Sequence, residues 1–256
     1  MRDIILGGFV IILLTVAHGL YLWWPKKDDD VARSDLGIAL MTGALIAVAV
    51  LGIQTSIDGK ARKRDERRQI ADARQNFELT LSLKSDLSGI RLDGEDLRGI
   101  HFYGKIMRRA SLNRAIMNGV VLSHAVLDSA SLQHTHLPEA IMDDALLRQA
   151  HLEHADLTGA ILSYAKMRGA KLADAHLESA TLTHAYVWYA DLRNAHLEGA
   201  SFSDAKLHGT DMTGATWDSA TGFEGALYDR FTKWPFGVKQ RKCRRDEQCV
   251  AANPPS

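Results

Sequence analysis

"HLEHADLTGAILSYAKMRGAKL", residues 151–172, repeats itself every five residues: alanine stands at 155, 160, 165 and 170, and leucine or methionine at 152, 157, 162, 167 and 172. An α-helix advances about 140° in five residues, so these alanines would not share one face. A flat strand would send successive alanines to opposite sides. The period fits only a chain that bends at every repeat, and four right-angle bends close a square coil.

The repeat is long and keeps its phase. Every fifth residue from Leu87 to Trp217 is apolar, which gives 27 centres, and a small residue usually lies two places before each centre. That place is alanine without exception from Ala140 to Ala205. Paired large and small side chains fill a narrow interior at high density. We therefore predict that both positions face inward, whereas residues such as Lys166 face outward.

The residues at the expected corners favour a turn with one positive φ angle. Glycine lies two residues after ten of the centres, at Gly89, Gly94, Gly99, Gly104, Gly119, Gly159, Gly169, Gly199, Gly209 and Gly214. Asp, Asn or His often takes this place elsewhere, and these residues tolerate positive φ. Pro138 lies one residue after a centre. This order is typical of a type II turn.

The pattern Ala-(Asp/Asn)-Leu-x-x, as in "ADLTG" (155–159), "ADLRN" (190–194) and "ASLNR" (110–114), resembles the pentapeptide-repeat family. The resemblance covers residues 87–240. It implies an all-β repeat solenoid, a right-handed quadrilateral β-helix with four pentads per coil, here over residues 86–220. Larger or charged residues replace the small one in the first coil, which we therefore expect to be irregular: Ile90, Glu95, Ile100 and Lys105.

Repeat arrays need capped ends. Residues 59–85 are predicted to form a basic stalk helix at 60–75 and a capping strand at 77–83, because "FELTLSL" alternates strictly. Residues 221–240 break the period, are rich in aromatics and resemble the family's terminal segment, so we expect an end cap. Residues 241–256 are expected to be a basic tail without fixed structure.

Two apolar stretches precede the repeats. Residues 4–24 and 36–57 carry no charged side chain and are about as long as a bilayer requires. They predict a two-helix transmembrane hairpin within residues 1–58, with Tyr21, Trp23 and Trp24 at the interface. A cleaved signal peptide is the alternative for the first stretch, but its apolar run is too long and lacks a small-residue cleavage site.

Positive charges predict the orientation of this hairpin. The loop 25–35 holds three Lys or Arg residues, whereas six follow the second span, at Lys60, Arg62, Lys63, Arg64, Arg67 and Arg68. Lys and Arg favour the cytoplasmic side. We expect a multi-pass protein of the bacterial inner (plasma) membrane with both termini in the cytoplasm. The basic stretch would also lie against anionic lipid, although a merely solvated helix fits it equally well.

Histidines and cysteines are candidates for functional, metal-binding or disulfide sites. His18 lies within the first span, where an ionisable residue suggests function, yet it is close enough to the aromatic belt to reach the interface. Residues 20 apart should stack, which pairs His134 with His154 and His176 with His196. A zinc site usually needs three or four ligands, so we assign no metal site and no cofactor. Cys243 and Cys249 are expected to be reduced in the cytoplasm, and would close a small disulfide loop if the orientation is reversed.

No catalytic motif emerges, and a convex rod with a filled interior offers no cleft. We therefore expect no enzyme and no catalytic residues. The favoured function is a membrane-anchored scaffold, held by lipid, whose rigid β-helix binds an unidentified protein partner. The alternative, implied by the resemblance, is DNA mimicry that protects a type II topoisomerase from quinolones. Mimicry needs a strongly acidic surface, whereas residues 87–225 carry 12 Lys or Arg against 17 Asp or Glu.

We expect no nucleic-acid partner, and the basic tail is taken as solvated. Open strand edges invite pairing with another chain, and the C-terminal end of the array is rich in aromatics: Trp217, Phe223, Tyr228, Phe231, Trp234 and Phe236. They either fold back over the last coil or mediate contact with a second copy. A homodimer through this end is the favoured expectation.

Overall fold

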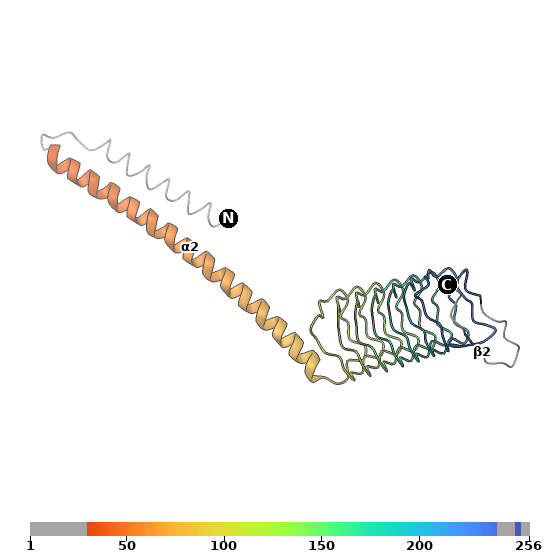
Figure 1. Cartoon of the computed structure of the whole chain (residues 1–256). Coiled ribbons are helices and arrows are strands. Elements are labelled where there is room, and N and C mark those ends of the chain that lie inside the picture. Colours follow the sequence, from red (N-terminus) through yellow and green to blue (C-terminus); the bar gives the residue numbers. More distant parts are fainter. Residues whose placement is uncertain (1–29, 240–248, 252–256) are drawn as a thin grey trace. The chain divides into compact units, whose positions relative to one another are not determined.

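The computed structural model describes residues 30–239 and 249–251, with the backbone alone at residues 30–42, 44 and 45. The chain divides into two compact units, residues 1–75 and 76–256. The helices and strands among the described residues are helix α2 (Asp30–Leu83), strand β1 (Leu227–Tyr228) and strand β2 (Cys249–Val250). Isolated parallel β-bridges form the rest of the second unit, whose coils stack in chain order in Figure 1.

The predicted stalk helix 60–75 lies inside α2. Among the residues that the structure describes, we find no helix with the length and apolar character that crossing a bilayer requires. The predicted first span, residues 4–24, and His18 within it lie outside the described residues. The predicted second span, residues 36–57, belongs to α2, although nine of its side chains are not described.

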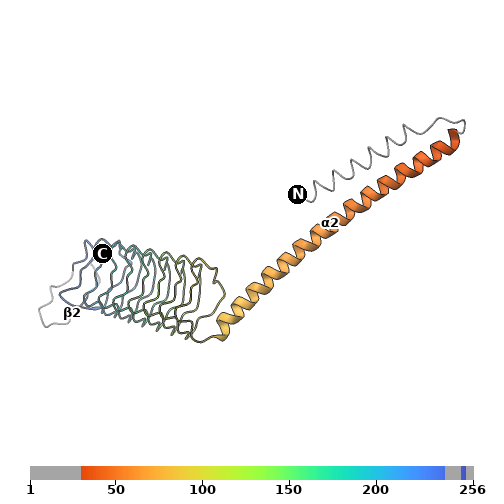
Figure 2. The ribbon, with the colours of Figure 1, turned by 180° about the vertical axis from the view of Figure 1, so that it is seen from behind.

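The second unit is a β-helix with 20 residues per coil. Parallel bridges join residues 20 apart without a break from Asp86 to Thr216, for example His151 with Lys171. Each bridge is held by hydrogen bonds on both sides: Leu152 N donates to Lys171 O at 2.7 Å, and Lys171 N donates to Ala150 O at 2.9 Å. Figure 2 shows the same stack from behind. Four short bridges per coil give the four faces that the five-residue period predicted.

The core has the predicted register. Every centre from Leu87 to Met212 is at most 3% exposed, and every alanine from Ala140 to Ala205 is at most 1% exposed. Trp217, the last centre, is only partly buried. The inward assignment of both positions is thus confirmed. Because a centre and an alanine are both buried in every pentad from Ala140 to Ala205, this part of the interior has little space into which a larger side chain could relax.

The corners have the predicted conformation. In the described part of the chain, sixteen non-glycine residues have positive φ, and all of them lie two residues after a centre, with φ between 54° and 60°. At Pro138, the predicted first middle position, Ala140 N donates to Leu137 O at 3.1 Å and closes the turn. Arg109, Gln149 and Tyr164 also adopt this conformation, so the buried residues on either side of a corner fix its geometry even where the residue itself disfavours it.

The predictions for the N-terminal end of the array were wrong. Residues 77–83 continue α2 instead of forming a strand, because Phe77 and Leu81 are four residues apart and reach the core from one helical face. The first coil is regular, with a bridge between Asp86 and Ile106. Lys105 points to the helix end, where its Nζ donates to the carbonyl oxygens of Ser82 and Lys84 at 2.5 and 2.7 Å. It therefore caps the last turn of α2.

At the other end, residues 221–233 continue the β-helix as a wider coil instead of only covering it. Gly222, Leu227 and Lys233 pair with residues 21 or 22 positions earlier. The residues by which this coil exceeds 20 lie in two turns of the same sequence type, Asp218–Thr221 and Asp229–Thr232. In the second, Asp229 Oδ1 accepts from the backbone nitrogens of Phe231 and Thr232. The threonine hydroxyl donates to Leu207 O at 2.8 Å.

The expectation of a tail without fixed structure was wrong for residues 249–251. Strand β2 pairs antiparallel with β1, Leu227 opposite Val250 and Tyr228 opposite Cys249. Cys249 and Ala251 are 1% and 3% exposed. This short apolar segment covers an edge that would otherwise leave unpaired backbone groups, so the capping strand lies at the C-terminal end of the array.

Candidate functional site on the faces of the β-helix

Outward side chains form straight columns, because each coil places its residues above those 20 positions earlier. We name each face by its first bridge residue: the Asp86, Arg91, Asp96 and His101 faces. The residue after each centre adds a second outward column to the same face. The outward neighbours of a side chain on a face are therefore the residues 20 positions away, on the next coils, and the residue two positions away, on the same coil.

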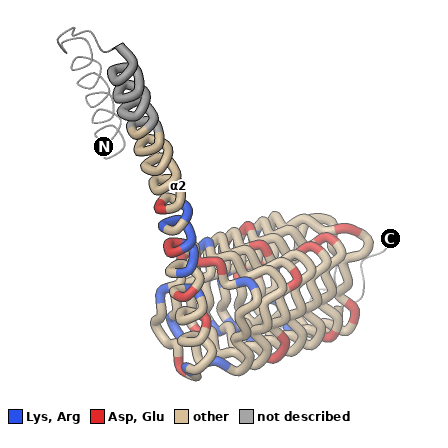
Figure 3. The backbone as a smooth tube through the Cα atoms, turned by 90° about the vertical axis from the view of Figure 1, so that its left-hand side faces the viewer, with Lys and Arg blue, Asp and Glu red and all other residues tan. Residues whose placement is uncertain are grey.

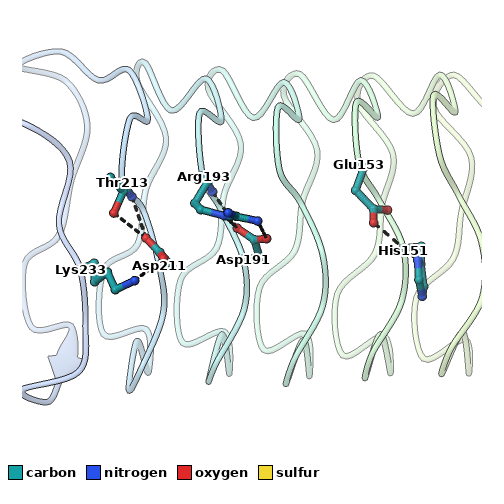
Figure 4. A network of polar contacts seen from close by, with 7 residues as sticks. All are labelled: His151, Glu153, Asp191, Arg193, Asp211, Thr213 and Lys233. Atoms are coloured by element: carbon teal, nitrogen blue, oxygen red, sulfur yellow. Dashed lines mark hydrogen bonds and ion pairs between the residues drawn. The ribbon is translucent and has the colours of Figure 1, made fainter.

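Several charged side chains of the Arg91 face pair with one another (Figure 4). Arg193 binds Asp191 through two parallel hydrogen bonds of 2.8 and 2.7 Å. One coil further, Lys233 Nζ and Thr213 Oγ1 donate to Asp211 at 2.8 and 2.6 Å. His151 Nδ1 lies 3.5 Å from Glu153. These partners leave few free charges for an external ligand on this face.

The carboxylates of this network titrate below their usual range. The hydrogen bond from Arg193 lowers the pKa of Asp191, and burial opposes this shift only in part. Burial would raise the pKa of Asp211, but the hydrogen bonds from Lys233 and Thr213 outweigh it and the pKa is lowered. Both groups are therefore held as carboxylates, which is consistent with a structural role.

The Asp86 face is different, because it carries a hollow lined by cations and aromatic rings. The hollow has a volume of about 350 Å³ and is lined by Arg148, Lys166, Arg168, Tyr186 and Trp188. Lys206 Nζ lies 4.2 Å from the centre of the Tyr186 ring. The rings of Trp188 and His208 meet edge to face at 5.8 Å. We call this set the basic-aromatic patch: Arg148, Lys166, Arg168, Tyr186, Trp188, Lys206 and His208.

Several polar groups of the patch lack a partner. Within residues 30–239 and 249–251, no carboxylate lies within ion-pair distance of Lys166 or Arg168. The enclosed Trp188 Nε1 and His208 Nδ1 have no hydrogen-bond partner either. A buried hydrogen-bond donor without an acceptor destabilises the folded state, and a ligand that accepts the hydrogen bond removes this cost. The patch is therefore suited to an anionic group placed against aromatic rings.

Charge is also unevenly distributed along the array. Figure 3 shows lysines and arginines gathered on the first coils and carboxylates spread over those that follow. From residue 115 to 225 the sequence has 6 Lys or Arg against 14 Asp or Glu. Four of those six cations belong to the basic-aromatic patch, so the patch stands out within an acidic stretch.

The sequence predicted some of this arrangement and missed the rest. The two histidine stacks are confirmed: ring centres are 4.8 Å apart for His134 and His154, and 4.5 Å apart for His176 and His196. The basic-aromatic patch was missed. Adding 20 to each outward position from Arg148 brings Arg168, Trp188 and His208 into one column, which is the signal that would have found it.

The cysteines differ from the expectation. Cys249 is disulfide-bonded, whereas reduced thiols were predicted. The chain has one other cysteine, Cys243, which lies outside the described residues. The burial of Cys249 beside β1 places its thiol where a cross-link would hold the cap in position.

Solved structures resemble the chain at low sequence identity. QnrB1, a plasmid-mediated fluoroquinolone resistance protein, is 18% identical with a TM-score of 0.44; the match covers 55% of this chain and 66% of QnrB1. A pentapeptide repeat protein from the thylakoid lumen of Arabidopsis thaliana is 24% identical with a TM-score of 0.32, covering 44% of this chain and 69% of that one. HetL of the cyanobacterium Nostoc, involved in heterocyst differentiation regulation, is 21% identical with a TM-score of 0.21, covering 55% and 88%.

These likenesses are too distant to transfer a partner or an activity. A comparison with curated protein sequences found no match. The sequence profile of pentapeptide repeats, by contrast, matches eight copies over residues 106–144, 140–178 and 175–214. The matched stretch coincides with the coils whose alanines and centres are buried. Residues 106–214 are therefore pentapeptide repeats folded as a β-helix.

Proposed function

We propose that this protein is a non-catalytic, membrane-anchored scaffold whose basic-aromatic patch binds an acidic segment of a partner protein. The patch carries the proposal because, among the described residues, Lys166 and Arg168 have no ion-pair partner and the enclosed Trp188 Nε1 has no acceptor, although Arg148 pairs with Asp128. On the Arg91 face, by contrast, Arg193 and Lys233 are both paired with aspartates. Trp, Tyr and Arg are the residues that most often dominate binding energy at protein interfaces. Here all three types line one hollow.

The chemistry of the patch selects the partner's side chains. A carboxylate in the hollow would accept from Arg168 and from Trp188 Nε1, and its neighbours would pack on Tyr186. Repeats of the array place equivalent positions one strand spacing apart. An extended acidic segment laid along the coils would therefore meet Arg148, Arg168 and Lys206 in succession.

The test is a cross-linking capture from membranes that compares matched variants of the full chain. Lys166→Glu combined with Arg168→Glu should abolish capture of the partner, since it repels an acidic segment. Lys171→Glu is the control, because Lys171 is equally exposed but lies on the Arg91 face. A partner that is lost equally with the control, or kept with the double variant, would contradict docking at this patch.

Membrane anchoring is supported by the apolar stretches 4–24 and 36–57. In the described part of α2, Ile46, Val50 and Ile53 are more than half exposed, as expected of side chains that meet lipid. The basic residues 60–68 that follow favour placing the β-helix on the cytoplasmic side. The disulfide at Cys249 opposes this orientation, since disulfides persist mainly in oxidising compartments.

One experiment separates these two indications. A reporter that works only in the cytoplasm is fused after Ser256 or inserted near Asp30, and the cysteines are alkylated in intact cells without reductant. The proposed orientation predicts activity for the first fusion alone, with both thiols alkylated. An inactive terminal fusion with thiols protected from alkylation would place the β-helix on the oxidising side and keep the anchor.

Topoisomerase protection is the second candidate. The acidic coils from residue 115 onward favour it, but the basic-aromatic patch interrupts their negative surface. A supercoiling assay with the purified chain, a quinolone and a type II topoisomerase tests it directly. Protection of the enzyme would overturn the scaffold proposal.

Self-association through the C-terminal end would use the aromatics that the cap leaves outside. Phe223, Tyr228 and Trp234 pack on one another at ring distances of 5.2 Å and cover the last coil. Phe231 and Phe236 are 57% and 96% exposed. Light scattering of the chain with and without Phe231→Asp and Phe236→Asp tests a dimer: equal masses would leave these residues without a role in assembly.

A further inference from the structure

The Asp96 face brings together three side chains of the types that bind transition metals. His176 and His196 lie on successive coils in one column, and Glu178 lies two residues after His176 in the adjacent column. One ligand atom from each of these three residues lies within 4.8 Å of the other two. His176 Nδ1 is 3.0 Å from Glu178 Oε1. The stack thus gains the third ligand that spacing of the histidines alone did not supply.

The carboxylates of the Asp96 face include oxygens that lack a hydrogen-bond donor, and a bound cation would supply the missing interaction. Glu178 Oε2 is enclosed and has no hydrogen-bond partner, and the same holds for Glu198 Oε2 one coil further. Enclosed carboxylate oxygens without a donor are costly. No lysine or arginine in the described part of the chain lies within ion-pair distance of either residue. The missing positive charge is what distinguishes this cluster from the paired carboxylates of the Arg91 face.

The ligand types select the class of ion. Imidazole nitrogens favour Zn²⁺, Cu²⁺ and Ni²⁺ over Mg²⁺ and Ca²⁺, which prefer all-oxygen sites. Two histidines and one glutamate are a ligand set found at zinc sites that keep an open position. Thr216 Oγ1 lies 3.3 Å from His196 Nδ1 and orients that ring, as outer partners of metal-binding histidines commonly do.

The site needs one adjustment to close on an ion. The two rings are parallel within 6° and their centres are 4.5 Å apart, whereas ligands around Zn²⁺ lie about 3.3 Å from one another, given bonds of about 2.0–2.1 Å. The rings must tilt toward each other. The side chain of His176 is 48% exposed, and the terminal torsion of histidine is broad, so the tilt requires no change in the backbone.

We propose that His176, Glu178 and His196 form a binding site for a divalent transition-metal ion, with Zn²⁺ as the ion used to test it. Bound there, the ion would connect two successive coils near the C-terminal half of the array. Because the ligands come together only in the folded β-helix, binding would stabilise the folded state by mass action. The proposal does not depend on the scaffold function, since no residue of the basic-aromatic patch takes part.

The test titrates Zn²⁺ into the full purified chain against a chromophoric chelator and measures the melting temperature with and without the ion. We expect one tight site per chain and a higher melting temperature with zinc. His176→Ala or His196→Ala should weaken binding at least as much as loss of an outer partner, which costs about 10–100-fold, and should remove the thermal shift.

The chain supplies a matched control. His134 and His154 stack in the same way, with rings parallel within 4°, but among the described residues no third ligand joins them in a group of metal-binding side chains. His154→Ala should leave zinc affinity unchanged. X-ray absorption of the zinc complex should indicate nitrogen and oxygen ligands without sulfur. Equal loss with the control, unchanged affinity in His196→Ala, or a sulfur shell would each overturn the site.

Discussion

The middle coils of the β-helix and its two ends are built by different rules. In the middle, each pentad repeats one solution: a buried centre, a buried alanine and a corner with one positive φ angle. At the ends the repeat stops and other segments take over. The end of α2 covers the first coil through Phe77 and Leu81, whereas a wider coil and strand β2 close the last one.

The difference shows that the conformation of a middle coil is specified by more contacts than that of an end. A middle coil is specified by its own residues and by the identical coils on both sides, so departures such as Thr135 are absorbed: its hydroxyl donates to Leu112 O at 2.8 Å in a fully buried position. An end has a neighbour on one side only. Specific contacts must replace the missing coil, and these contacts occur once in the chain.

The largest effect is expected in the middle. Ala165→Leu adds a branched side chain at a position that is 0% exposed between two coils. Overpacking of this kind typically costs about 1–3 kcal/mol, so we expect a clearly lower free energy of unfolding in thermal or denaturant melts. Lys166→Leu, the exposed neighbour, is the control. Similar melting of the two variants would refute the inward register.

The second prediction compares the cost in stability of replacing Thr232, at the C-terminal end of the array, with that of replacing Thr135, in the middle. Thr232→Ala removes the hydroxyl that donates to Leu207 O and accepts from Asp229 N, so we expect a cost of about 1–3 kcal/mol. Thr135→Ala restores the alanine of the repeat and should cost less than about 1 kcal/mol. Denaturant melts of both variants measure the difference. Equal costs would mean that the wider coil does not depend on its own turn.

The third prediction concerns the N-terminal end. Lys105→Ala removes the hydrogen bonds to Ser82 O, in the last turn of α2, and to Lys84 O, just after the helix ends. A cation at the C-terminus of a helix typically contributes about 0.3–1 kcal/mol near the surface, and we expect the loss to be local. Hydrogen exchange should become faster in residues 77–85 and stay unchanged around Ala165. Unchanged exchange at 77–85 would show that Leu81 alone fixes the helix end.

The smallest effect is expected from pH. The pKa values of Asp191 and Asp211 are lowered by folding, so their stabilisation is present above their unfolded pKa of about 4 and is lost as the pH falls through the lower folded values. The melting temperature should therefore fall as the pH drops below about 4. Asp191→Asn should make this fall shallower. An identical pH profile for that variant would exclude Asp191 as a contributor.

Several features followed directly from residue patterns. The five-residue period placed Ala165 inside and Lys166 outside, and the glycines and Pro138 located the corners. The prediction of a strand at 77–83 failed because Phe77 and Leu81 fit the alternation of a strand and the four-residue spacing of a helix equally well. The prediction for the tail failed because a two-residue strand such as Cys249–Val250 carries too little pattern to be recognised.

By itself the sequence determined the shape of a coil, because a strict repeat leaves the backbone one way to bury every alanine and every centre. The tertiary structure decided what lies beside what: that Lys105 caps α2, that β2 covers β1, and that Glu178 stands next to stacked His176 and His196. These contacts join residues from different coils or different elements. Their energies depend on distance and burial in space, which no local pattern of residues contains.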